Sequence, residues 1–277
     1  MGSGSWRRKN SGFIQVVVAS ISDSNEAVAY SKRLKEDALL YKQFRNGETD
    51  DVDLQAYWVG LRIMKFTAGY PLLLAAHHKL NAEEQKKLAQ AIIALVIRHN
   101  IVAGQDRGKL ESVAYSTAKL ISSGTGYAGA LEELKRISPS DEVFLQGFKK
   151  LEFSKNEQQM ARYLLRAFDY ALGETSEITV AGPDKVHVEH IYPQTPPDAD
   201  KWPEHDTYIN RIGNLTLLDY ALNEKIKNSK FPVKKEKGYA ASRLVVTQKL
   251  LPLADWNPEA VEARQKSWAI LQINSGL

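Results

Sequence analysis

The strongest chemical signal is an acid beside an imidazole, Glu189-His190, in a short apolar stretch that ends at Pro193. A carboxylate can bind a hard cation, and a neutral histidine can take a proton from an attacking water. Mg²⁺ needs few protein oxygens because it keeps several of its waters, so one carboxylate and one amide oxygen suffice. Three downstream asparagines could supply amide oxygens: Asn214, Asn223 and Asn228. The set predicts a metal-assisted hydrolytic site.

The spacing of these residues constrains the backbone around them. In a regular strand, Glu189 and His190 would point to opposite faces. Both side chains can serve one site only if the strand ends or bends there, and Pro193 is consistent with such an ending. His187 would share a face with Glu189 and is a secondary candidate for contact with metal or phosphate, although a structural role is favoured. Asn228 is the other secondary candidate.

Charge is distributed unevenly along this half of the chain. From Glu177 to Asp206, seven acids outnumber two bases, whereas from Arg211 to Lys249 nine bases outnumber three acids. An acidic stretch beside a basic one suits a site that holds a cation and then a polyanion such as DNA. Two solvated surfaces are the alternative explanation. The expected phosphate contacts are Arg211, Lys225, Lys227, Lys230, Lys234 and Lys235.

Composition excludes several classes of protein. The 277 residues include no cysteine, which excludes disulfide scaffolds, thiol nucleophiles and cysteine-based zinc sites, so no zinc is expected. The chain is 43% hydrophobic and 25% charged, as in ordinary globular proteins. No apolar run approaches the roughly 18 residues that a membrane helix needs. Together with the lack of a signal peptide, this predicts a cytoplasmic protein without a membrane partner.

Two regions are expected, with a boundary near residue 173. Apolar residues at helical spacing predict helices throughout 24–172. Beyond them the pattern changes to an α+β unit with C-terminal helices. Its expected elements are strands at 178–181 and 186–191 around a turn, a loop at 193–206, an apolar run at 215–218, a short helix from 219, and helices at about 238–250 and 258–271. The fold class is therefore mainly α with a small α+β unit. Residues 1–23 are expected to be an added linker and lead-in segment.

The motif pieces occur in an order that resembles an HNH nuclease, a ββα-metal motif. The matching pieces are Glu-His-Ile-x-Pro at 189–193, Gly-Asn-Leu-x-Leu-Leu at 213–218 and an asparagine nine residues beyond Asn214. More narrowly, the C-terminal region is similar to the nuclease domain of the GmrSD-type modification-dependent restriction endonucleases. Further shared residues are Asn223, Asn228, Ser229, Phe231, Lys234, Lys235, Tyr239, Ser242, Thr247, Trp256, Arg264 and Trp268. The helical region 24–172 resembles the stretch that precedes this nuclease in single-chain members.

This resemblance implies a helical platform, 24–173, followed by an HNH nuclease domain, 174–277. It also implies specific roles. His190 would be the general base, Glu189 the first metal ligand and Asn223 the second, while Asn214 would hydrogen-bond across the loop and fix the strand that carries the base. The implied cofactor is Mg²⁺, with Mn²⁺ expected to substitute. The implied reaction hydrolyses DNA phosphodiesters to 5′-phosphate and 3′-hydroxyl ends.

The resemblance also implies partners and a setting. The family's upstream half, a nucleotide-dependent sensor, is not seen in the chain, so a separate sensor domain or subunit is expected. One active site per chain implies nicking of one DNA strand unless two chains cooperate as a homodimer. The implied setting is bacterial defence against phage or other foreign DNA.

Two other functions are weighed against the nuclease. A DNA-binding module with a vestigial site would keep the lysines and bind DNA without cutting it. A helical interaction module would use residues 24–172 to receive the sensor, with the nuclease secondary. The intact set of Glu189, His190, Asn214 and Asn223 favours catalysis over the first alternative.

Overall fold

The computed structural model describes residues 21–173 and 185–274, which form two compact units that meet at Arg62 and Ile63. Helices dominate both units, and the described strands form one small antiparallel sheet. The chain is thus mainly α with a small β unit, as predicted. No helix among the described residues is long and apolar enough to cross a membrane. The predicted strand 178–181 and most of the predicted lead-in segment lie outside the described residues.

The first unit contains helix α2 (Ser24–Asn46) and all but the last residue of α3 (Val52–Ile63). Asp23 caps the start of α2, where its carboxylate accepts from two backbone N–H groups. The helix ends at Gly47, whose φ of 71° is readily adopted by glycine. Phe44 packs edge-on against Trp58, with 4.7 Å between the ring centroids. Helix α2 lies within the region 24–172 that was predicted to be helical.

The second unit begins with helices that follow the predicted spans closely. Asn81 and Glu84 form a capping box at the start of helix α5 (Ala82–Val96). A π-helix at Ile97–Val102 continues that helix. The predicted break at Gly69-Tyr70-Pro71 falls where a new helix begins. The helices are α4 (Gly69–Lys79), α5 (Ala82–Val96), α6 (Arg107–Ser122), α7 (Gly126–Lys135), α8 (Asp141–Phe148) and α9 (Gln158–Leu172).

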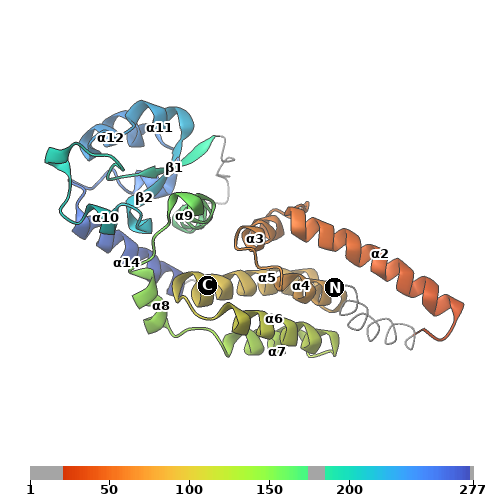
Figure 1. Cartoon of the computed structure of the whole chain (residues 1–277). Coiled ribbons are helices and arrows are strands. Elements are labelled where there is room, and N and C mark those ends of the chain that lie inside the picture. Colours follow the sequence, from red (N-terminus) through yellow and green to blue (C-terminus); the bar gives the residue numbers. More distant parts are fainter. Residues whose placement is uncertain (1–20, 174–184, 275–277) are drawn as a thin grey trace, which may run out of the picture. The chain divides into compact units, whose positions relative to one another are not determined.

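The sheet pairs β1 (Val186–His190) with β2 (Leu215–Asp219) in antiparallel register, so Glu189 lies opposite Thr216. Between the strands lie single turns of 3-10 helix at Asp198–Asp200 and Ile212–Asn214 and the short helix α10 (His205–Tyr208). Helix α11 (Tyr220–Ile226) follows β2 directly, capped by the Asp219 carboxylate. The element order at the motif is therefore strand, long loop, strand, helix, and Figure 1 shows these elements together.

The C-terminal segments differ from the sequence prediction at one place. A helix was expected over about 238–250, but the structure has a 3-10 turn at Tyr239–Ala241 and the short helix α13 (Val245–Gln248). Ser242 interrupts the helix because its hydroxyl accepts from the N–H of Leu244. The remaining elements are α12 (Phe231–Lys237) and α14 (Pro258–Asn274), and the latter confirms the predicted final helix.

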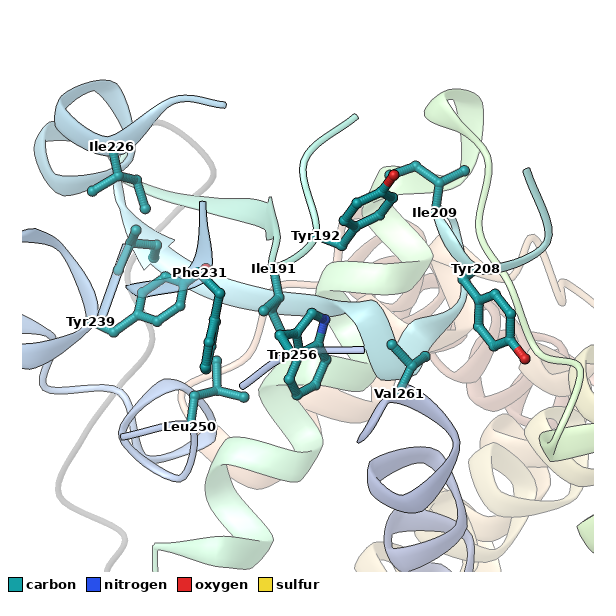
Figure 2. Packing of buried hydrophobic residues seen from close by; sticks show 11 residues of the cluster. Ile191, Tyr192, Tyr208, Ile209, Ile226, Phe231, Tyr239, Leu250, Trp256 and Val261 are labelled. Carbon is teal, nitrogen blue, oxygen red and sulfur yellow. The ribbon is translucent and has the colours of Figure 1, made fainter. Parts of the chain in front are cut away.

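The sheet is covered on both sides. Helix α9 packs on β1 and β2, while α11 and α13 pack on the sheet from the C-terminal segments. Leu218 of β2 belongs to a buried apolar cluster that gathers residues from the loop, α11, α12 and α14, as Figure 2 shows. The cluster consists of Ile191, Tyr192, Tyr208, Ile209, Leu218, Ile226, Phe231, Tyr239, Leu250, Trp256 and Val261. The motif strands therefore sit inside a hydrophobic core rather than on an exposed sheet.

A buried carboxylate joins α9 to α13. Asp169 is 3% exposed, and its Oδ1 accepts from the backbone N–H of Val246 at 2.9 Å. Burial raises the pKa of Asp169, whereas the hydrogen bonds from Val246 and Val245 act in the opposite direction. The helix that covers the sheet thus depends on a polar contact with a segment about 77 residues further along the chain.

We predict that Asp169→Ala lowers the free energy of unfolding by about 1–3 kcal/mol, because it leaves the buried N–H of Val246 unpaired. Asp169→Asn retains an acceptor oxygen and should lose less. Urea denaturation of the two variants and the wild type measures the difference. Equal midpoints for wild type and the alanine variant would show that this contact does not stabilise the fold.

Candidate active site at the end of strand β1

Strand β1 ends at His190, the residue expected to act as a base. Glu189 and His190 lie opposite Thr216 and Leu215, so their side chains point to opposite faces of the sheet. Both are buried, at 6% and 8% exposure. After His190, the chain leaves the sheet, although the N–H of Ile191 still donates to the carbonyl of Asn214 at 2.9 Å. Strand β1 therefore includes both residues, and their side chains do not converge on one face as a shared site would require.

Glu189 is held by a buried lysine. Lys234 Nζ donates to Glu189 Oε1 at 2.5 Å and to the His190 carbonyl at 2.6 Å, and the Tyr239 hydroxyl donates to the same carboxylate oxygen at 3.3 Å. Burial raises the pKa of Glu189 and lowers that of Lys234, but each charge favours the ionised form of the other. We describe them as an ion pair, because the ammonium has two oxygen acceptors at short distance.

The two lysines first expected to contact DNA are both engaged inside the protein. Lys234 is 1% exposed and is enclosed by the contacts just described. It lies three residues after the buried Phe231 on α12, hence on the same helix face. Lys235 is half-buried and donates to the carbonyl of Leu253 at 2.5 Å. The burial of Lys234 corrects the prediction that it contacts DNA, whereas the prediction for the half-buried Lys235 stays a prediction.

His190 is a neutral imidazole at pH 7. Burial, followed by the charge of Lys234, lowers its pKa to about 4, and a hydrogen bond with the Asn210 side chain acts in the opposite direction. The side-chain nitrogen of Gln194, an exposed residue, lies 3.3 Å from His190 Nε2. This edge of the ring is therefore next to the surface. A neutral ring at such a position can accept a proton from water.

Asn214 uses its whole side chain to hold the chain beyond His190. Its Oδ1 accepts from the Tyr192 N–H at 2.8 Å and from the Trp256 indole at 2.9 Å. Its Nδ2 donates to the carbonyls of Tyr192 at 3.2 Å and Ile209 at 3.0 Å. An asparagine side chain offers two donors and one oxygen with two lone pairs, so these four bonds use all of them. Asn214 positions the loop and has no atom to offer a substrate.

The loop after the motif is anchored by stacked aromatic rings. Tyr192 and Trp202 stack with 3.7 Å between centroids and an angle of 5° between the planes. The backbone N–H of Trp202 also donates to the Tyr192 hydroxyl at 2.9 Å. Because Asn214 holds the backbone of Tyr192 and Trp202 holds its ring, the loop between β1 and α10 is fixed at its first residues.

The other candidate residues lie on α11 and around it. Asn223 is half-buried on α11, which packs on both strands. Asn228 is exposed and donates to the Thr195 hydroxyl at 2.7 Å, joining the turn after α11 to the loop. His187 contacts Tyr220 edge-on, with 4.9 Å between ring centroids. Lys227 ends α11 with a φ of 42°, a conformation that non-glycine residues seldom adopt.

The remaining basic candidates differ in whether their charged groups already contact other residues. Arg211 donates to the carbonyl of Lys149 at 2.6 Å and lies over the ring of Tyr208. Lys230 forms an ion pair with Asp200 at 2.7 Å. Lys225 and Lys227 are exposed at the end of α11. These last two are the best-placed of the predicted set to meet a phosphate.

The donor set around Glu189 does not fit a divalent cation as the resemblance implied. The carboxylate charge of Glu189 is already balanced by an ammonium at 2.5 Å, and a dication brought to the same oxygen would be repelled by it. No catalytic step is therefore assigned to a metal bound at Glu189.

Several residues of this site were missed from the sequence. Lys234 and Tyr239 bind Glu189, Asn210 bonds His190, and Gln194 lies at its Nε2 edge. One usable signal was the position of Lys234 on α12, on the same face as Phe231. Gln194 directly follows the Glu-His-Ile-x-Pro segment and could have been found from its proximity. Nothing in the sequence around Asn210 indicated its contact.

Comparison with protein-family models gives a match in the C-terminal part of the chain. Residues 138–269 match the family model described as the C-terminal domain of GmrSD restriction endonucleases. No curated protein matches the chain. The matched segment runs from just before α8 to near the end of α14, so it contains both strands and every candidate residue discussed above. Residues 138–269 of this chain therefore belong to the C-terminal domain family of the GmrSD restriction endonucleases.

Proposed function

We propose that residues 138–269 form an HNH-type nuclease domain that hydrolyses phosphodiester bonds in DNA, with His190 as the general base. The observation that carries this proposal is a neutral, positioned imidazole at the end of β1, inside a segment that belongs to a restriction endonuclease family. The order strand, loop, strand, helix supports the HNH assignment.

In the proposed reaction, His190 takes a proton from the water that attacks phosphorus in line with the leaving oxygen. A pKa of about 4 makes the free imidazole a weak base. A phosphodiester carries a negative charge, and an opposite charge nearby favours the protonated imidazole. The substrate would thus raise the proton affinity of its own base. Asn214 holds the loop next to the base, and no step is assigned to Glu189.

The proposed cofactor is a divalent cation. Mg²⁺, with Mn²⁺ in its place, would supply positive charge at the leaving oxygen if the reaction uses a cation. The paired state of Glu189 gives no support for a site at that carboxylate. The other predicted ligand is Asn223, which is half-buried on α11. We propose Asn223 as a ligand of the cation.

The partners follow from the proposed reaction. DNA is the substrate, and Lys225 and Lys227 at the end of α11 are the proposed phosphate contacts. We also propose an upstream sensor domain or subunit, a role in bacterial defence against foreign DNA, and a cytoplasmic location. Cutting both strands would require two chains to act together.

The first prediction of this function concerns the base. His190→Ala should reduce plasmid nicking by roughly 10²–10⁴-fold, the usual loss when a general base is removed, while DNA affinity changes little. Nicking is followed with Mg²⁺, with Mn²⁺ and with EDTA. His77→Ala, an exposed histidine on α4, is the matched control. Nicking by the His190 variant at the wild-type rate would remove His190 from this role. If neither protein cuts while DNA is still bound, the chain is better described as a DNA-binding module.

The second prediction concerns the phosphate contacts. Replacing Lys225 and Lys227 with Ala should flatten the log–log dependence of DNA affinity on salt by about two, since each lost contact changes the slope by about 0.9. The loss should be the same for all DNA sequences, because phosphate contacts carry no base information. Fluorescence anisotropy across a salt series measures the slope. Lys109→Ala/Lys119→Ala on α6 removes the same charge from exposed positions and should leave the slope unchanged. Identical slopes for both double variants would place the DNA elsewhere.

A further inference from the structure

A buried lysine connects two consecutive residues at the end of β1. Lys234 Nζ bonds the side chain of Glu189 at 2.5 Å and the main-chain carbonyl of His190 at 2.6 Å. The lysine is 1% exposed, so it cannot meet DNA directly. Its two acceptors belong to neighbouring residues whose side chains face opposite sides of the sheet, so the ammonium restrains the backbone between them.

This restraint acts on the orientation of the imidazole. A side chain is aimed by the φ and ψ of its own residue, and Lys234 bonds the carbonyl oxygen that defines the ψ of His190. On the far side of that peptide, the N–H of Ile191 donates to the carbonyl of Asn214. The peptide after His190 is thus held at both its oxygen and its nitrogen. Without the ammonium, only the nitrogen contact would remain.

The charge of the pair is also suited to a positioning role. An unpaired ammonium beside His190 would act on the ring as a full positive charge, whereas Glu189 compensates it at 2.5 Å. The Tyr239 hydroxyl is a second donor to the same carboxylate. Because Lys234 is buried, paired with a carboxylate and bonded to a backbone carbonyl, it does not interact with solvent or with a polyanion. Its remaining effects are on the groups it bonds and, through its charge, on the pKa of His190.

We propose that Lys234 is a positioning residue for the nuclease reaction, which acts through Glu189 and the His190 carbonyl to hold the His190 imidazole in its productive orientation. This inference rests on the function proposed above. It gives Glu189 the role of partner to Lys234. It also separates Lys234 from the surface lysines, because the loss of Lys234 should affect the chemical step rather than DNA binding.

The kinetic test uses Lys234→Met, which removes the ammonium and keeps the length of the side chain. We expect kcat for plasmid nicking to fall between tenfold and about a hundredfold with KM unchanged, since misplacing a catalytic group by about 1 Å costs on that order. Lys237→Met, an exposed lysine on the same helix, is the control and should nick like the wild type. All assays are run below the thermal transition of each variant.

A double-mutant cycle separates positioning from a general loss of structure. In a His190→Ala background, Lys234→Met should cause no further loss of cleavage, because there is no imidazole left to position. A further loss equal to that seen in the wild-type background would overturn the proposal. If Lys234→Met does not fold, Glu189→Gln/Lys234→Met removes both buried charges and takes its place in the same cycle.

A spectroscopic readout keeps the test independent of activity. The chain has six histidines, and His190→Ala identifies the imidazole signal of His190 by its absence in ¹⁵N-histidine spectra. Lys234→Met should move this signal and leave the other five in place. An unmoved His190 signal would refute positioning. If the wild-type protein does not cut DNA, the proposed function fails, while the spectra still decide whether Lys234 positions His190.

Discussion

A buried ammonium needs acceptors, and that need organises the end of strand β1. Lys234 is almost fully enclosed, and taking its charge out of water would be very costly without compensation. The compensation comes from the Glu189 carboxylate and the His190 carbonyl, which ties α12 to the sheet. A second cation, which is half-buried, has a similar role at β2. Arg264 of α14 donates to the carbonyls of Gly213 and Leu215, on either side of the turn that enters the strand.

The neutral counterpart of these cations is Asn214. Its carbonyl and its side chain bond the backbone of Ile191 and Tyr192, the two residues that follow His190. The segment from Glu189 to Tyr192 is consequently bonded at each residue by a partner distant in sequence. Catalytic groups lose rate when their supporting contacts are loose, so such bracketing is what a base at a strand end requires. Ile191 and Tyr192 of this segment belong to the buried apolar cluster shown in Figure 2.

The helices before residue 173 could be predicted from local signals, because caps and apolar spacing act over a few residues. Asn81 with Glu84 and the glycine at 47 are examples. The pairing of β1 with β2 could not be predicted in this way, since the two strands are separated by a long loop and their pairing is selected by packing. The helix expected near 238–250 failed because Ser242 bonds its own backbone locally. The predicted domain boundary near 173 lies beside residues that are not described and stays a prediction.

The candidate site shows the same limit, because its contacts join residues that are distant in sequence. Its motif residues were found because their types are unusual for a strand, but their partners were not. Lys234 was grouped with surface lysines by composition, although it shares the buried face of α12 with Phe231. A lysine on such a face must find an acceptor inside, and Lys234 finds it in Glu189 of β1. A charged residue on an apolar helix face therefore indicates an internal partner. Lys225 and Lys227, at the end of α11, are exposed and agree with the prediction of surface lysines. Separating lysines by helix face before assigning them to DNA would have removed Lys234 from the DNA-contacting set.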